Sequence, residues 1–319
     1  MATTYIYPSA FSPFTSLTSG SSHSGVLVSG TSSDVGGAIK SATTEASDAA
    51  KAARGSSLAA FICHTAYLEQ SLQSEQQSGF FAGKRRLVTA DRTRIGEGAS
   101  FVVDRARLVD GPLAPDSKPV YVAIKTAREG STADAEDSAE RSRRWRDTLF
   151  EIRALLHQPL RYHPNVVRLL DIRWDGSGSL FPTLVVELAE FGTLHSLQRA
   201  RPALPFSVKQ KLCYDVGKGL SILHACGIVH GDLKHENVLV FANRYPDPPG
   251  QPYTAKLADF GGAVMDMAGD GDGQHRVPSS TFPLDAPEIH SGSRLTVEGV
   301  KKTDAYSYGM LIWRCMLDC

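Results

Sequence analysis

Hydrophobic positions in the first half of the chain are spaced as they are in β-strands. Residues 100–109 and 120–126 are rich in valine and aromatic residues, and a connection containing glycine and proline separates them. Residues 166–173 and 182–188 have the same character. Runs of this kind, bounded by turn residues, predict strands. The first half of the chain is therefore predicted to form a sheet.

Helical spacing dominates elsewhere. Residues 144–157 and 208–225 each place apolar side chains three and four positions apart, which predicts amphipathic helices. Strands followed by helices indicate an α+β fold. The apolar stripes consist of Leu149, Ile152, Leu155 and Leu156 in the first helix, and of Leu212, Val216, Leu220 and Leu223 in the second.

The N-terminal region has a different composition. Residues 1–57 are dominated by Ser, Thr, Gly and Ala, with no charged side chain before Asp34. Such a segment buries too little apolar surface to offset the entropy of ordering, which predicts disorder. Residues 58–77 have a weak helical rhythm that fits either a short docking helix or a marginal helix without consequence. We therefore predict a largely disordered region over 1–86 and a folded domain over 87–319.

Charge and cysteine content exclude several classes of protein. Lys and Arg number 34 and Asp and Glu also 34, so nothing indicates nucleic acid or an anionic membrane as the main partner. The five cysteines have no metal-site spacing, which favours reduced thiols. No apolar run reaches the roughly 18 residues of a membrane span, and the N-terminus lacks the features of a secretory signal. These features predict a soluble intracellular protein, cytoplasmic or nuclear.

The segment His230-Gly-Asp-Leu-Lys-His-Glu-Asn237 carries the clearest chemistry. It supplies a carboxylate, a cation and an amide at fixed offsets, and Asp259-Phe260-Gly261 follows 22 residues after Asn237. Mg²⁺ prefers hard oxygen ligands, which suits Asn and Asp better than the nearby histidines. This set of groups can transfer a phosphoryl group from a nucleotide to a hydroxyl. Asp-Phe-Gly alone is a common turn, but its spacing after the first motif makes a chance match improbable.

Two weaker motifs precede it. Ile95-Gly-Glu-Gly-Ala-Ser-Phe-Val-Val103 contains glycines that let backbone N–H groups approach phosphate oxygens. A strand follows instead of the helix that a dinucleotide-binding fingerprint requires. A plain hairpin turn is the alternative. Val122-Ala-Ile-Lys125 places a lysine in an apolar strand, where a buried ammonium needs partners; the alternative is a lysine at the sheet edge that reaches solvent.

These motifs, in this order, resemble those of the protein kinases from about Leu87 onward. The resemblance implies a bilobal fold, with an antiparallel sheet and one helix in an N-lobe over about 87–187. A mainly helical C-lobe would span about 190–319. ATP and Mg²⁺ are the cofactors that it implies.

The resemblance also implies roles for individual residues of the catalytic loop and for Asp259. Asp232 would accept or orient the proton of the substrate hydroxyl, and Lys234 would neutralise charge on the transferring phosphate. Asn237 and Asp259 would hold the metal. His230 would pack behind the loop, so we do not interpret it as a general base.

The nucleotide site is implied in the same way. Lys125 would contact the α- and β-phosphates and pair with Glu151. Glu187 and Ala189 would bind adenine through their backbone, and Val186 would be the gatekeeper. The full set of expected nucleotide contacts is Ile95, Gly96, Glu97, Gly98, Ala99, Val103, Ala123, Lys125, Val186, Glu187, Ala189 and Leu239.

The type of acceptor is indicated downstream. Ala286-Pro287-Glu288 lies 29 residues after Asp259, and Thr281 precedes Ala286 by five. Together with Lys234, Thr281 favours serine and threonine acceptors on protein substrates over tyrosine. The sequence Tyr306-Ser-Tyr-Gly-Met-Leu-Ile-Trp313 resembles that of the tyrosine-kinase-like group of serine/threonine kinases. The alternatives are a catalytically inactive kinase-like scaffold and a small-molecule kinase of similar fold.

Two departures from the family pattern stand out. Gly231 replaces the arginine that clamps a phosphorylated activation loop, so activity is predicted not to require that phosphorylation. Only 15 residues follow Asp304, which predicts an incomplete C-lobe, truncated after that helix, with an uncovered surface open to a partner. It also predicts that Glu288 lacks its arginine partner. The residues expected to be partly uncovered are Tyr306, Tyr308, Met310, Leu311, Ile312, Trp313 and Met316.

Overall fold

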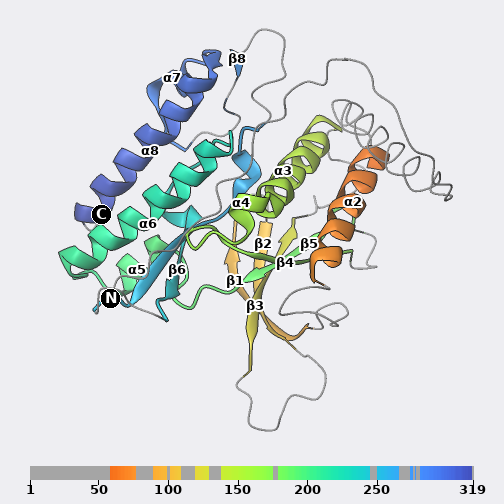
Figure 1. The fold of residues 1–319 in the computed structure, drawn as a ribbon, viewed down its shortest axis with the longest axis horizontal. Coiled ribbons are helices and arrows are strands. Elements are labelled where there is room, and N and C mark those ends of the chain that lie inside the picture. The colour runs from red at the N-terminus through yellow and green to blue at the C-terminus, as the bar shows by residue number, and fades with distance from the viewer. Residues whose placement is uncertain are drawn as a thin grey trace, which may run out of the picture. The chain divides into compact units, whose positions relative to one another are not determined.

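The fold was examined in a computed structural model of the chain (Figure 1). The structure describes residues 58–76, 89–98, 101–108, 119–128, 138–174, 179–244, 250–265, 274–275, 277 and 281–317. Of the region predicted to be largely disordered, 1–86, residues 58–76 are described and form a helix, and the remainder lies outside the described residues. Among the described residues, no helix combines the length and apolar character that crossing a bilayer requires.

Five antiparallel strands form the sheet of the N-lobe in the order β1-β2-β3-β5-β4. All four predicted strands are present, and β1 adds a fifth on the outer edge. The strands are β1 (Thr89–Glu97), β2 (Phe101–Leu108), β3 (Tyr121–Ala127), β4 (Leu169–Arg173) and β5 (Thr183–Glu187).

Strand β3 lies in the middle of this sheet and is buried along most of its length. Consecutive residues 122–125 are buried, so both faces of the strand are covered here, which accounts for its nearly continuous apolar sequence. Its register places Lys125 opposite Val103 of β2 and Leu184 of β5. Lys125 is therefore held at a fixed point in the interior of the lobe.

Helix α3 (Ser138–Leu156) packs beside the sheet, and helix α2 (Leu58–Gln76) lies alongside α3 (Figure 1). The prediction placed the start of α3 at residue 144, which was too late. The extra N-terminal residues are polar, and Glu140 pairs with Arg144 one turn later at 2.9 Å. For residues 58–77, the structure supports the docking-helix alternative.

The C-lobe is mainly helical, as predicted, and the α+β class is confirmed. The 20-residue helix α6 (Phe206–Ala225) is its centre and packs against α8 and the hairpin β6–β7. Its predicted apolar stripe is buried. The other elements are α4 (Gln158–Arg161), α5 (Leu194–Ala200), η1 (His235–Asn237), β6 (Val238–Ala242), β7 (Tyr253–Leu257), η2 (Phe260–Gly262), β8 (Gln274–His275), α7 (Pro287–His290), β9 (Leu295–Thr296) and α8 (Val297–Leu317).

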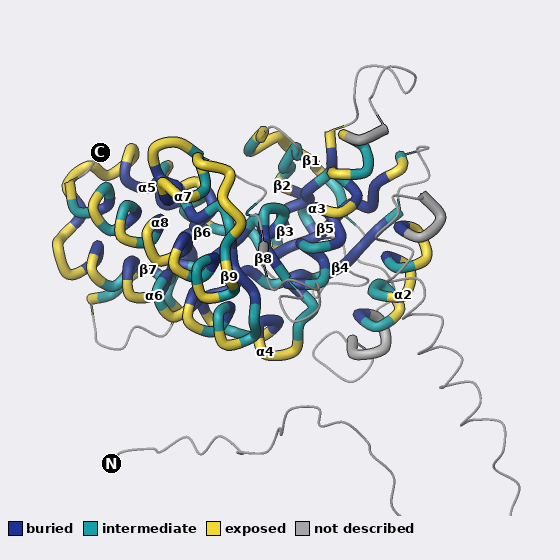
Figure 2. Tube along the Cα trace, turned by 90° about the horizontal axis from the view of Figure 1, so that it is seen from above, coloured by how far each residue is buried: buried dark blue, intermediate teal, exposed yellow. Residues whose placement is uncertain are grey.

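Helix α8 is buried on one side only, with buried and exposed positions alternating along it (Figure 2). Tyr306 and Trp313 are exposed at 42% and 56%, in line with the prediction. The expectation for Leu311 was wrong: its side chain is fully buried in the core that also contains Leu212 of α6. Leu311 and Cys315 are four residues apart and lie on the same face of the helix.

Candidate active site

The catalytic loop connects α6 to β6, and helix α8 holds it through one carboxylate. Asp304 accepts hydrogen bonds from the backbone N–H groups of His230 at 2.8 Å and Gly231 at 2.9 Å. The ring of His224 lies 2.8 Å from the same carboxylate. Since Asp304 is almost fully buried, these bonds form away from competing water. Asp304 thus braces the catalytic loop from helix α8.

Gly231 brings the catalytic loop against the loop that carries Asp259. Its φ is +77°, and a Cβ added there would lie 2.3 Å from the carbonyl oxygen of Gly262. A side chain would therefore meet both backbone strain and a backbone atom. A β-bridge between Val229 and Val264 joins the same two segments. An arginine at position 231 would therefore clash with the backbone of Gly262, which gives a steric reason for the glycine.

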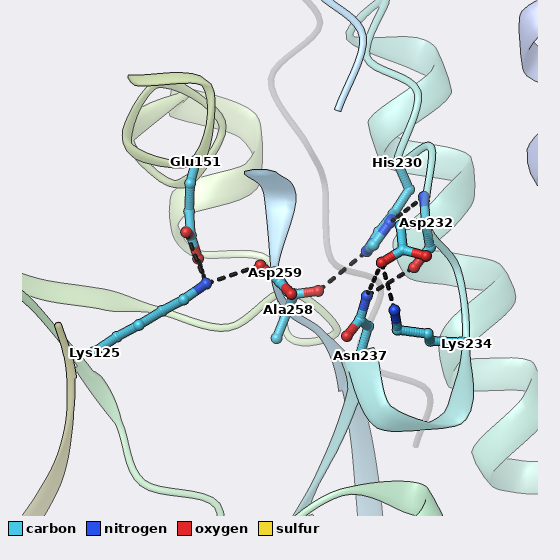
Figure 3. Close-up of polar contacts among 8 residues, drawn as sticks. All are labelled: Lys125, Glu151, His230, Asp232, Lys234, Asn237, Ala258 and Asp259. Atoms are coloured by element: carbon cyan, nitrogen blue, oxygen red, sulfur yellow. Dashed lines mark hydrogen bonds and ion pairs between the residues drawn. The ribbon is translucent and has the colours of Figure 1, made fainter. Parts of the chain in front are cut away.

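The side chains of the catalytic loop converge on Asp232 (Figure 3). Lys234 Nζ lies 2.7 Å from Asp232 Oδ2, and Asn237 Nδ2 donates to the carbonyl oxygen of Asp232 at 2.8 Å and to its Oδ2 at 3.1 Å. The hydroxyl of Thr281 donates to Asp232 Oδ1 at 2.7 Å and lies 3.3 Å from Lys234 Nζ. Thr281, which lies 49 residues after Asp232 in the chain, thus contacts both the Asp232 carboxylate and the Lys234 ammonium.

A second polar group surrounds Lys125 (Figure 3). Its Nζ donates to both carboxylate oxygens of Glu151, at 2.7 and 2.8 Å, and to Oδ1 of Asp259 at 2.8 Å. Lys125 is 9% exposed and Glu151 is 2% exposed. The strand, the helix and the loop after β7 therefore meet at one ammonium group.

Charge and burial compete at this group. Burial acts to lower the pKa of Lys125, but Asp259 and Glu151 outweigh it, so the pKa is raised. Burial acts to raise the pKa of Asp259, but Lys125 and more distant cations hold it below its usual value. The pKa of Glu151 is raised because burial, with Asp259 nearby, outweighs Lys125. Lys125 and Asp259 thus favour each other's charged form.

His230 contacts both the catalytic loop at Asp232 and the segment next to Asp259. Its ring is fully buried, with Nε2 3.1 Å from the carbonyl oxygen of Ala258, and it packs 5.2 Å from the ring of Phe260. The N–H of Asp232 lies 3.4 Å from its Nδ1. Asp259, next to Ala258, has a φ of +65°, a conformation that costs energy for a residue other than glycine. The position of His230 matches the predicted packing role.

The expected adenine contacts lie in one apolar cluster. Ala123 and Val186 are register partners on β3 and β5. Both belong to the main hydrophobic core, and Val103, Ala189 and Leu239 pack against it. Strands of the N-lobe and β6 of the C-lobe therefore contribute to the same apolar surface.

The expected phosphate loop is the turn between β1 and β2. Gly96 pairs with Val103, and the N–H of Gly98 donates to the carbonyl of Phe101 at 2.8 Å. Ile95 and Glu97 are exposed. Ala99 lies outside the described residues.

Several contacts carry no local signal in the sequence. Arg128 donates to the carbonyl of Gly98 at 3.3 Å and pairs with Glu97. The ring of Phe101, at the start of β2, lies 4.0 Å from Lys125 Nζ, a distance that permits a cation–π interaction.

The side chain of Glu187 is also engaged. Lys256 donates to its two carboxylate oxygens at 2.7 and 2.8 Å, and the N–H of Arg168 donates to Oε1 at 2.8 Å. Only the backbone of Glu187 had been assigned a role. The ion pair joins β5 of the N-lobe to β7 of the C-lobe, beside the expected adenine surface.

Comparison with known proteins gives a consistent result. A family model described as the protein kinase domain matches residues 91–319. The probable serine/threonine-protein kinase PBL18 of Arabidopsis thaliana is 30% identical over 226 residues, which cover 68% of this chain and 50% of that protein. Serine/threonine-protein kinase GIN4 of Saccharomyces cerevisiae is 35% identical over 162 residues, covering 50% of this chain and 12% of that protein. The chain thus spans at most half the length of these two relatives.

Proposed function

Because the chain belongs to the protein kinase family, we propose that it transfers the γ-phosphoryl group of ATP to serine and threonine hydroxyls of protein substrates. The observation that carries the proposal is the bonding of Lys125 to both Glu151 and Asp259. It joins the sheet, the helix and the metal loop in the arrangement that phosphoryl transfer by this family requires. The scaffold alternative is disfavoured, because every side chain that the chemistry needs is present and in contact.

The acceptor side of the reaction would depend on Asp232. Its carboxylate would accept the proton of the substrate hydroxyl, and Lys234 would neutralise charge on the transferring phosphate. The hydroxyl of Thr281 already lies against both groups. We infer that this hydroxyl marks the position at which a serine or threonine substrate is received.

The nucleotide side would depend on Lys125 and the apolar surface. Lys125 would contact the α- and β-phosphates, while the glycine-rich turn covers them with backbone N–H groups. Val103, Ala123 and Leu239 would sandwich the adenine ring, with Val186 as the gatekeeper, and Glu187 and Ala189 would bind its edge through their backbone.

The donor set also fits a magnesium ion. Asp259 offers a carboxylate held in its charged form, and the two amide hydrogens of Asn237 are directed at Asp232, which leaves Asn237 Oδ1 as a hard oxygen ligand. Within the described residues, no three His, Cys, Asp or Glu side chains form a metal cluster. This agrees with a site of few protein ligands, because Mg²⁺ is usually held by one or two carboxylates plus substrate phosphates. When bound, Mg²⁺ neutralises charge on the phosphates.

We also propose that the catalytic domain spans residues 87–319, with the lobes divided between 187 and 190, and that the protein works inside the cell, in the cytoplasm or nucleus. The use of ATP and the free thiols of the described cysteines support an intracellular site. Protein substrates and a partner at the exposed face of α8 complete the proposal.

Phosphate transfer from labelled ATP to serine and threonine peptides tests the function. The full chain should label these peptides in a magnesium-dependent reaction. Lys125→Met and Asp232→Asn should each lower the rate about 100-fold or more, while thermal melting shows that both variants remain folded. Transfer that survives in both variants, or a folded wild-type protein that transfers nothing, would overturn the proposal.

A further inference from the structure

Helix α2 is docked on α3, although it lies outside the matched kinase domain. Figure 1 shows the two helices side by side, and the main contacts of α2 are with α3 and β4. Phe61, Thr65 and Leu72 of α2 are buried, with Phe61 only 2% exposed. Their spacing of four and seven residues places them on one face of the helix. This face of α2 is therefore in contact with the N-lobe.

Phe61 is the centre of an aromatic contact. Its ring stacks on Trp145 of α3, with centroids 5.7 Å apart and planes 17° apart. It meets Trp174 and Phe181 edge-on at 6.2 and 6.1 Å. Both geometries are favourable for aromatic pairs. Phe61 thus connects α3 to segments beside β4 and β5.

Residues on both sides of Glu151 in α3 share buried clusters with residues of α2. Leu149 belongs to the same buried cluster as Phe61. Ile152 belongs to the same buried cluster as Leu72. Glu151 lies between Leu149 and Ile152, so α2 supports the turn of α3 that presents this carboxylate to Lys125.

The aromatic cluster also approaches the other member of the ion pair. Phe101 packs against the cluster that contains Phe61 and Trp145, and its ring lies 4.0 Å from Lys125 Nζ. A buried ion pair requires close geometry, because desolvation of both charges offsets most of their attraction. A small outward movement of α3 would therefore break the pair.

From these contacts we propose that α2 positions α3 for phosphoryl transfer, and that Phe61 is a positioning residue acting through Glu151. The inference rests on the proposed kinase function and adds a regulatory element outside the catalytic domain. When α2 is docked, Glu151 bonds Lys125. When α2 is released, α3 moves and Lys125 loses that partner.

Hydrogen exchange tests the positioning independently of activity. In the full chain, Phe61→Ala should speed exchange of the α3 amides around Glu151 by about tenfold or more, because local opening becomes easier. Val300→Ala is the matched control, since Val300 is fully buried in α8 of the other lobe and belongs to a cluster that contains no residue of α2 or α3. It should leave exchange in α3 near the wild-type rate at a temperature where both variants are folded. Equal acceleration of α3 in both variants, or no acceleration in Phe61→Ala, would overturn the proposal.

A double-mutant cycle tests whether Phe61 acts through Glu151. Phe61→Ala should lower kcat/KM for ATP about tenfold in the wild-type background and less than about twofold in Glu151→Gln, because interacting residues are not additive. Phe61→Leu should recover part of the loss. Equal losses in both backgrounds would indicate a merely structural role and sink the idea. If the wild type transfers no phosphate, the proposed function fails, and the exchange experiment alone decides the role of α2.

Discussion

The two loops beside the expected phosphate site are held in opposite ways. The catalytic loop, residues 228–237, is mostly buried, and the carboxylate of Asp304 bonds two of its N–H groups. In the turn between β1 and β2, the described residues Ile95, Glu97 and Gly98 are exposed, and Arg128 contacts Glu97 and Gly98 at the surface. Buried hydrogen bonds are costly to break, whereas exposed ion pairs contribute little. The catalytic loop is therefore fixed by buried bonds, whereas the described residues of the glycine-rich turn are held by surface contacts.

Removing the Asp304 carboxylate should give the largest effect. Asp304→Ala leaves two buried N–H groups and His224 without their acceptor, so we expect the free energy of unfolding to fall by about 3–5 kcal/mol. Urea unfolding measures this change. Asp304→Asn is the matched control, because its amide oxygen can still accept one of the bonds, and it should lose less. Equal stability of Asp304→Ala and wild type would show that the loop does not depend on this carboxylate.

Filling the space at Gly231 should have the next largest effect. Gly231→Ala combines a positive φ with a Cβ 2.3 Å from a carbonyl oxygen, so we expect a loss of about 2–3 kcal/mol. Gly227→Ala is the control: its φ is +71°, but no atom lies within 4 Å of the added Cβ. It should cost roughly 1 kcal/mol. If thermal melting ranked the two variants equally, the close contact with Gly262 would not contribute.

How far the sequence could predict these features depends on the distance between partners. Asp232, Lys234 and Asn237 are close together in the chain, so a short motif was enough to bring them forward as candidates. The partner of Lys125, Glu151, came only from the resemblance to a family, since 26 residues separate the two. Phe61 and Trp145 are 84 residues apart and match no motif, which is why only the structure could reveal their contact.

Burial was harder to predict than position. The strands could be located because each is a continuous apolar run between turns. Which residues of α8 are exposed could not be predicted in this way. Leu311 and Trp313 are both apolar, and only the packing against α6 decides that Leu311 is buried and Trp313 is not. The start of α3 was missed for a related reason: its first residues are polar, and periodicity gives no signal there.

Removing the contact of Arg128 with the turn between β1 and β2 should change ATP binding more than the free energy of unfolding. Arg128→Ala removes a surface contact to Gly98 and Glu97, so the free energy of unfolding should change by less than about 1 kcal/mol. Under the proposed function, KM for ATP should rise about threefold, which corresponds to ~0.7 kcal/mol, with kcat unchanged. Arg199→Ala, at an exposed position of α5, provides a surface control. A stability loss as large as that of Gly231→Ala would remove the contrast between the two loops.

The smallest effect concerns Asp259, whose carboxylate bonds Lys125 and so connects the loop after β7 to strand β3. Since its pKa is lower in the folded protein than in the unfolded chain, its charged form stabilises the fold above the unfolded pKa of about 3.9. That contribution is lost as the pH falls through the lower, folded pKa. The side chain is 44% exposed, so solvent screening should limit it to less than about 1 kcal/mol. Wild type should therefore lose more stability than Asp259→Asn between pH 6 and the onset of acid unfolding, as measured by urea midpoints. A gap that stays constant or widens at low pH would show that Lys125 does not stabilise the Asp259 carboxylate.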